Sequence, residues 1–319
     1  MSPPAPQPAA HEHDFARAAL PIAILTLIWG CNWPVLKIGV TELAPLTFRG
    51  LTLPFAAVGM LLVAHFAGDS VRIPRAWWPR VATLAFFNIG AWNGFVLFGV
   101  QHMPAGRSAI LAYTMPIWAT LIGAFVLHEP LSRQKLVGLG LGTLGMAILL
   151  GEEMREIRHA PLGAVLILMA AVCWSIGTVL LRKWKPPVAQ NTLSGWMMLA
   201  GWVPLGLLAP VFDPQPLAQT LVHLSGRGWF ALLYNVFLAG TIAHWAWFRL
   251  ARTMPVAVSS LSALPVPVVG VFAGILVLNE RPGLQEWLAL GLVVLALFTV
   301  LLPSGSRREP VAAPLAPDD

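Results

Sequence analysis

A few polar side chains interrupt the long apolar runs of this 319-residue chain. Their amides, hydroxyls and imidazole can donate and accept hydrogen bonds. The sequence contains neither an HExxH nor a GxSxG motif, and no pair of aspartates within the apolar runs, so a hydrolase or metalloenzyme site is not indicated. We therefore expect reversible binding, with no enzymatic activity, no metal and no cofactor. The candidate binding residues are Asn32, Asn88, Asn93, Tyr113, Ser175, Thr178, His244, Ser259 and Ser262.

Tryptophan is the second unusual residue type, with 14 copies. Trp29 and Trp33 are four residues apart, as are Asn88 and Trp92, so each pair shares one face of a helix. Together with Trp174, these rings would form flat apolar walls beside amide groups, a lining that suits a zwitterion with an apolar or aromatic side chain. One alternative stays open. The rings could fill a core and the polar groups could join helices, with His244 buried and hydrogen-bonded.

The elements that must position these residues are membrane-spanning helices. The chain is 57% hydrophobic and 11% charged, with a mean hydropathy of +0.73, which exceeds what one soluble core would bury. Apolar runs of about 17–25 residues match the length of a helix that crosses the bilayer. Basic residues give a net charge of +6 but lie in short loops, so the expected partner is lipid and not nucleic acid. Ten runs begin near Ala18, Pro45, Trp78, Ala105, Gln134, Ala160, Val188, Gly228, Pro255 and Leu284.

The two halves of the chain repeat each other. Met103-Pro104, Pro116 and Glu129 recur 151 residues later without a gap. We therefore expect two homologous units, 18–151 and 160–302. Because each unit has an odd number of helices, five, the second unit enters the membrane from the opposite side to the first. The predicted fold is therefore an all-α membrane protein of two inverted five-helix repeats around a central cavity. A duplication of this kind points to transport. The remaining segments are a disordered N-terminal tail (1–17), a periplasmic linker (152–159) and a disordered C-terminal tail (303–319).

Lysines and arginines predict the orientation. If the N-terminus is cytoplasmic, 13 of the 20 basic residues face the cytoplasm, and both termini lie on that side. Lys37, Arg49 and Arg107 are among those assigned to the outer side.

Three residues are candidates for gating. Pro116 and Pro267 occupy matching depths in the two halves, where each removes a helix hydrogen bond; they could also be kinks that only shape packing. Lys37 ends the face that carries Trp29 and Trp33 and could close the outer mouth, or simply extend to the interface.

Carboxylates are confined to the ends of the apolar runs. Glu129 and Glu280 each precede a predicted helix, whose exposed N–H groups they could cap. Because no acidic residue lies within a span, coupling to protons is not indicated.

These features resemble the ten-helix EamA-type branch of the drug/metabolite transporter superfamily. The resemblance covers about residues 18–302 and rests on the repeat, the Trp-Gly-Cys-Asn-Trp segment that begins at Trp29, and the Leu-His-Glu129 and Leu-Asn-Glu280 sequences. The chain is similar to bacterial aromatic amino-acid exporters. The resemblance implies an inner-membrane exporter of amino acids with broad specificity. We expect it to act as a monomer by alternating access and, because no acidic residue lies within a span, to be facilitated and not proton-coupled. Efflux of drugs or other metabolites is the alternative.

Overall fold

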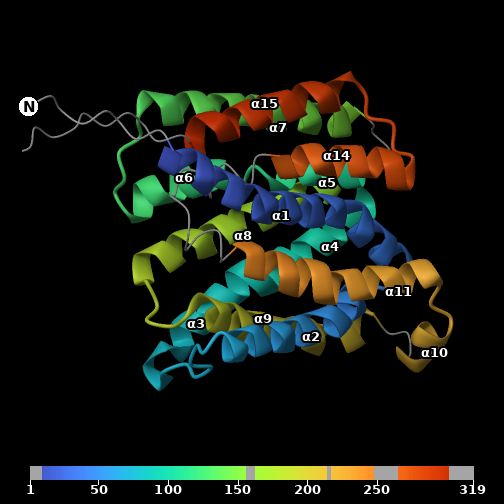
Figure 1. Ribbon diagram of the computed structural model, residues 1–319. Coiled ribbons are helices and arrows are strands. Elements are labelled where there is room, and N and C mark those ends of the chain that lie inside the picture. Colours follow the sequence, from blue (N-terminus) through green and yellow to red (C-terminus); the bar gives the residue numbers. More distant parts are fainter. Residues whose placement is uncertain (1–8, 156–161, 214–216, 248–264, 302–319) are drawn as a thin grey trace, which may run out of the picture.

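The computed structural model describes residues 9–155, 162–213, 217–247 and 265–301, and these residues form helices joined by short turns (Figure 1). The predicted tails and linker lie largely outside them, so the domain boundaries stay predictions. The helices run side by side in one bundle. In the first half they are α1 (Ala9–Glu42), α2 (Pro45–Phe66), η1 (Arg75–Trp77), α3 (Trp78–Ala85), η2 (Phe86–Ala91), α4 (Trp92–His102), α5 (Ala105–Ala112), α6 (Met115–Val126) and α7 (Arg133–Arg155). In the second half they are α8 (Leu162–Trp184), α9 (Gln190–Phe212), α10 (Leu217–Val222), α11 (Gly226–Leu233), η3 (Tyr234–Ile242), α14 (Pro265–Leu278) and α15 (Leu284–Leu301).

Eight stretches of the described residues are long and apolar enough to span a membrane. Their first residues lie within about three positions of the predicted starts, from Leu20 in the first span to Gly226 in the eighth. Two shorter apolar helices follow, Pro265–Leu278 and Leu284–Val300. The predicted start of the ninth span, Pro255, lies outside the described residues. The chain is thus an all-helical, multi-pass membrane protein.

The bundle is layered (Figure 1). Helices α7 and α15 pack together along one edge, and α2 packs on α9 along the opposite edge. Between them, α1 packs on α14 and α4 on α8, so helices from both halves of the chain alternate through the middle. The functional candidates of α1, α4 and α8 are therefore brought together at the centre.

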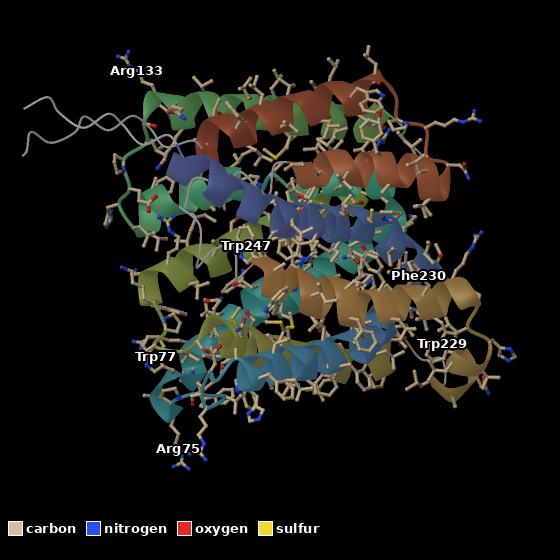
Figure 2. All side chains as sticks on the ribbon, in the orientation of Figure 1. Arg75, Trp77, Arg133, Trp229, Phe230 and Trp247 are labelled. Carbon is tan, nitrogen blue, oxygen red and sulfur yellow. The ribbon has the colours of Figure 1, made fainter. Side chains whose placement is uncertain are left out.

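The outside of the bundle is strongly apolar. Phe125 and Leu276 are both 79% exposed, as expected for side chains that face lipid. Figure 2 shows Arg75, Trp77 and Arg133 at one end of the bundle and Trp229 at the other. Charged and tryptophan side chains at both ends of apolar helices are typical of the two interfaces of a membrane.

Three of the spans that the structure describes depart from regular α-helix. The fourth is interrupted between Ala112 and Met115, and Pro116 lies in the first turn of α6. The expectation that Pro116 kinks one continuous helix is therefore corrected: a proline is tolerated in a first turn because its missing N–H has no partner there. In the third and eighth spans, η2 and η3 are π-helical. Such segments expose backbone carbonyls and often occur at functional sites.

The structure also shows a local likeness between the halves. His128 and Asn279, which are 151 residues apart, both adopt the left-handed conformation, with φ of 53° and 54°. In each case the next residue, Glu129 or Glu280, donates its N–H to a carbonyl of the preceding helix, that of Gly123 or Gly274. This pattern ends a helix by satisfying its last carbonyls. The two Leu-X-Glu sequences thus fold into the same helix end.

Candidate functional site

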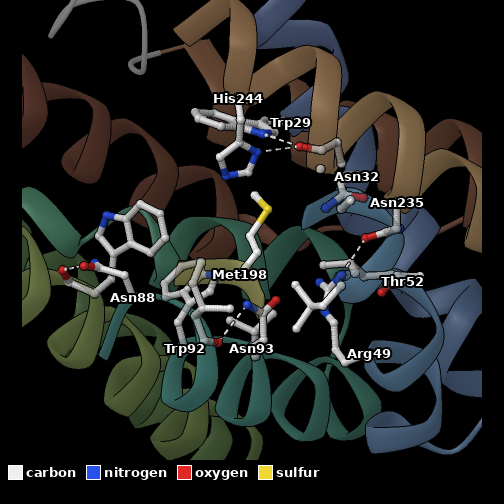
Figure 3. A pocket seen from close by; sticks show the side chains of 18 of the residues that line it. Trp29, Asn32, Arg49, Thr52, Asn88, Trp92, Asn93, Met198, Asn235 and His244 are labelled. Carbon is white, nitrogen blue, oxygen red and sulfur yellow. Dashed lines mark hydrogen bonds between the residues drawn. The ribbon is translucent and has the colours of Figure 1, made fainter. Parts of the chain in front are cut away.

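A cavity of about 140 Å³ lies at the centre of the bundle. Side chains of α1, α2, α4, α8, α9 and the two π-helical segments line it (Figure 3). Nine of the thirteen predicted binding residues are among its lining residues. These nine are Trp29, Asn32, Trp33, Asn88, Trp92, Asn93, Tyr113, Trp174 and His244.

The other four predicted residues differ in their placement. The Ser175 Oγ lies 2.7 Å from the carbonyl oxygens of both Met115 and Ala171, which share its single O–H donor, and so it joins α8 to the start of α6. The Thr178 hydroxyl donates to the Trp174 carbonyl of its own helix at 2.8 Å. Neither side chain is part of the cavity lining. Ser259 and Ser262 lie outside the described residues.

The π-helical segments hold two polar side chains of the cavity. Asn93 donates its Nδ2 to the Ile89 carbonyl at 2.8 Å, and His244 donates from Nδ1 to the Ala239 carbonyl at 2.9 Å (Figure 3). Asn93 and His244 are 151 residues apart, and each bonds to a carbonyl of the π-helical segment that precedes it in the chain. The Ala239 carbonyl also accepts from Trp29 Nε1, at 3.4 Å. The two segments thereby fix the orientation of the groups around the cavity.

Aromatic rings form two walls of the cavity. The ring centroids of Trp92 and Trp174 are 5.1 Å apart with a tilt of 56°. Trp29 meets His244 edge-on at 5.4 Å. Each pair joins one ring from the first half of the chain to one from the second. Because such pairs pack rigidly, they present a preformed apolar surface.

Asn88 is held by a close fit between η2 and α8. Its Nδ2 donates to the Trp174 carbonyl at 2.9 Å, which fixes the amide with Oδ1 as the remaining acceptor. A Cβ atom on Gly177 would lie 2.4 Å from Asn88 Cγ and would force the side chain to move. Gly177 is therefore a requirement of this site.

We expect Gly177→Ala to destabilise the protein by about 1–3 kcal/mol, the usual cost of overpacking, and to weaken substrate binding as Asn88 is displaced. Thermal unfolding in detergent measures the first effect and a binding titration the second. Gly140→Ala, on α7 where nothing lies within 4 Å, is the matched control and should be neutral or stabilising. Equal thermal stability and equal substrate binding in Gly177→Ala and Gly140→Ala would contradict this account of Gly177.

Arg49 is a cavity residue that the sequence analysis misplaced. It was assigned to the outer loops, but it lies in the second turn of α2, is 7% exposed and lines the cavity. Its Nη1 donates to Asn235 Oδ1 at 2.9 Å (Figure 3). The error arose because Arg49 lies close to the start of the span, where a charge is usually assigned to the interface. A signal was present: Arg49 corresponds to Ser194 at the 145-residue offset of the neighbouring Gly50 and Gly195, so both halves are polar there.

Sequence reasoning also missed further lining residues. Asn235 lies in η3 and holds Arg49, while Thr52 and Met198 come from α2 and α9. Asn235 also corresponds to an apolar residue, Leu84, at the 151-residue offset, so the repeat carried no signal for it.

Charged groups join helices at one end of the bundle. Lys37 Nζ donates to the carbonyls of Val100, Gln101 and Met103, at 2.7, 3.0 and 3.1 Å. These carbonyls end α4, where the helix dipole favours a cation. Lys37 thus ties α1 to the end of α4.

Glu280 joins helices at the same end from the second half of the chain. Its two carboxylate oxygens accept from the N–H groups of Ala105 and Gly106, at 2.6 and 2.9 Å. The carboxylate therefore caps α5, and not α15, the helix that follows it in sequence and that the sequence analysis expected. Next to it, Arg107 Nε lies 2.5 Å from Glu286 Oε1, with side chains 11% and 8% exposed.

At the opposite end, the described residues include a more exposed ion-pair group. Glu129 pairs with Arg182, whose side chain is 55% exposed, and lies 3.8 Å from Lys135 Nζ. The third gating candidate, Pro267, is buried near the start of the described part of α14.

Comparison with known proteins agrees with these features. Residues 16–151 and 161–302 each match the model of the EamA-like transporter family. The chain belongs to this family. It is a membrane transporter, and the family is not one of enzymes.

Similar proteins include two curated relatives and one solved structure. The "Uncharacterized inner membrane transporter YedA" of Escherichia coli (strain K12) is 29% identical over 298 residues, 92% of this chain and 94% of the relative. A "Probable amino-acid metabolite efflux pump" of Salmonella typhimurium is 28% identical over 266 residues, 81% of this chain and 85% of the relative. A structure titled "Crystal structure of protein" is 20% identical, with a TM-score of 0.64 over 89% of this chain and 97% of that one. This last likeness concerns the fold alone.

Proposed function

We propose that this EamA-family protein exports amino acids across the bacterial inner membrane, with broad specificity that includes apolar and aromatic side chains. The observation that carries the proposal is the central cavity, in which paired tryptophan rings lie beside amide groups. The rings suit an apolar or aromatic side chain, and the amides suit the charged groups of a zwitterion. The name of the Salmonella relative, "Probable amino-acid metabolite efflux pump", supports the same class of substrate.

The proposed architecture has ten spans in two inverted repeats, with both termini in the cytoplasm and one chain as the functional unit. Eight spans and two shorter apolar helices are consistent with it. In this orientation the end closed by Lys37 and Glu280 faces the periplasm. Substrate enters the cavity from the cytoplasm and leaves when that end opens. Pro116 and Pro267 would be the points about which helix segments move during this exchange.

Transport of this kind is expected to be facilitated. Among the described residues that line the cavity, none is an aspartate or glutamate that could carry a proton. The substrate gradient would then be the driving force. An imposed pH gradient that drives an amino acid above equilibrium in liposomes would contradict this part of the proposal.

Counterflow in liposomes that contain the purified protein tests the proposed substrate class. We expect labelled phenylalanine and leucine to accumulate in vesicles preloaded with the unlabelled amino acid, with saturable kinetics, and not in protein-free vesicles. The alternative is efflux of drugs or other metabolites. Counterflow of a quaternary amine, with none of any amino acid, would establish that alternative and refute the proposal.

The role proposed for Lys37 predicts that Lys37→Met opens the periplasmic end, because three carbonyl bonds to the end of α4 are lost. We expect a membrane-impermeant maleimide to label Leu36→Cys several times faster in this variant, in a chain whose Cys31 and Cys173 are replaced by alanine. Lys135→Met, at the other end, is the control and should leave labelling unchanged. Equal labelling with and without Lys37 would refute the gating role.

A further inference from the structure

We propose that Arg49 binds the carboxylate of the transported substrate, so that the cavity selects carboxylate-bearing molecules and rejects amines that lack this group. The inference rests on the proposed function and specifies which chemical group the site recognises. Three observations support it: the burial of the guanidinium in a cavity whose described lining residues include no acidic side chain, its incomplete hydrogen bonding, and amide oxygens in the same cavity that lack a partner among the described residues.

The first observation is a buried charge that has no acidic side chain beside it among the described residues of the cavity lining. Arg49 is 7% exposed and lies inside the second span. Among the described residues that line the cavity, Arg49 is the only lysine or arginine, and none of those residues is an aspartate or a glutamate. A charge at such a position is costly to bury unless it is paired, and a charge of this kind in a membrane protein commonly marks a substrate pathway. The cavity therefore favours an anionic group.

The second observation is the state of the guanidinium's donors. Nη1 donates to Asn235 Oδ1 at 2.9 Å, and Asn235 Nδ2 donates in turn to the Ala231 carbonyl at 3.1 Å. Asn235 is thus a positioning residue that holds Arg49 against η3. Arg49 Nε is buried and has no hydrogen-bond partner among the described residues. A guanidinium has several N–H donors in a planar fork, a geometry that matches the two oxygens of a carboxylate.

The third observation is a set of acceptors elsewhere in the same cavity. Asn32 Oδ1 and Asn88 Oδ1 are also buried without a partner among the described residues. Figure 3 shows Asn88 on the side of Trp92, away from Arg49, with Asn93 and Met198 between them. Amide oxygens can accept from an ammonium group but attract it more weakly than a carboxylate would. The cavity thus offers its strongest polar interaction to the carboxylate and a weaker one to the ammonium.

Competition against phenylalanine counterflow tests the proposal in the wild-type protein. Two probes each keep the phenyl ring and one charged group: 3-phenylpropanoate retains the carboxylate, and phenethylamine retains the ammonium. We expect 3-phenylpropanoate to inhibit at concentrations at least about tenfold lower than phenethylamine, the usual effect of one charge-assisted hydrogen bond. Inhibition by phenethylamine that is as strong as that by 3-phenylpropanoate would overturn the proposal and leave amino-acid export standing.

Arg49 variants locate the effect. We expect Arg49→Gln to raise the KM for phenylalanine at least about tenfold and to abolish the preference for 3-phenylpropanoate over phenethylamine. Arg49→Lys keeps a positive charge, so it should show a smaller rise in KM and a reduced preference. Arg80→Gln, which removes an exposed arginine of α3, is the matched control and should change neither. An unchanged preference in a folded Arg49→Gln protein would refute the assignment.

A direct binding measurement separates the two proposals. If no amino acid shows counterflow, the proposed function fails, and equilibrium binding of labelled 3-phenylpropanoate to purified wild-type and Arg49→Gln protein still tests the arginine. Binding that is lost in Arg49→Gln supports the carboxylate site. Absence of binding to both proteins, or equal binding to both, refutes it.

Discussion

Replacing Glu280 by alanine is expected to reduce transport at least about tenfold and to destabilise the protein by several kcal/mol. The carboxylate accepts from two part-buried backbone N–H groups, those of Ala105 and Gly106. Leaving a buried donor unpaired costs about 1–3 kcal/mol each, and the N-terminus of α5 also loses its anion. Because these contacts join the two halves of the chain, the same change should loosen the closed end.

Counterflow of phenylalanine measures the effect of Glu280→Ala on transport, and SDS-induced unfolding in mixed micelles measures stability. Transport and stability of Glu280→Gln should lie between those of the wild type and those of Glu280→Ala, since the glutamine amide keeps one acceptor oxygen. The matched control is Glu129→Ala at the opposite end, whose partner Arg182 is largely exposed, so that the pair contributes only about 0–1 kcal/mol. If Glu129→Ala lowers stability as much as Glu280→Ala, this account of Glu280 is wrong.

The second large effect is expected at Arg107 and Glu286. These side chains are 11% and 8% exposed, and Arg107 Nε lies 2.5 Å from Glu286 Oε1. Glu286 Oε2 also accepts from the Gly283 N–H at 2.8 Å. We expect Arg107→Met alone to destabilise the protein by about 3–5 kcal/mol, because a buried carboxylate loses its counter-charge.

The double variant Arg107→Met, Glu286→Leu should recover much of that loss, since replacing both partners of a buried pair by apolar groups is often neutral. Unfolding in mixed micelles of the wild type, both single variants and the double variant completes the thermodynamic cycle. Additive losses in the double variant would show that the pair is not coupled, contrary to the geometry.

Much of the fold could be predicted from the sequence, because membrane spans depend on local composition. The first eight predicted span starts agree with the structure within about three residues. A span of apolar residues must form a helix in lipid regardless of its neighbours. The interruptions within spans were harder to predict from the sequence. The interruption at Tyr113 and Thr114 was predicted as a kink at Pro116, and nothing in the sequence indicated that η2 and η3 are π-helical.

The candidate site was only partly predictable, for a related reason. Polar and tryptophan residues within spans stand out in the sequence, and nine of the thirteen predicted ones line the cavity. Ser175 and Thr178 lie on α8 but use their hydroxyls for backbone carbonyls, which composition cannot distinguish from a cavity role. Arg49 was missed because its burial depends on where α2 begins and on Asn235, a residue 186 positions away. Contacts of that range follow from packing and not from a local pattern.

The central claim is that the cavity between the tryptophan walls binds the transported amino acid. Saturation binding of labelled phenylalanine to the purified protein tests it most directly, with Trp92→Ala compared with Phe125→Ala, which removes a ring that is 79% exposed on the outside of the bundle. We predict saturable binding to the wild type, a dissociation constant raised at least about tenfold in Trp92→Ala by the loss of an aromatic wall, and no change in Phe125→Ala. Undiminished binding in Trp92→Ala, or no saturable binding of phenylalanine to the wild type, would contradict the account.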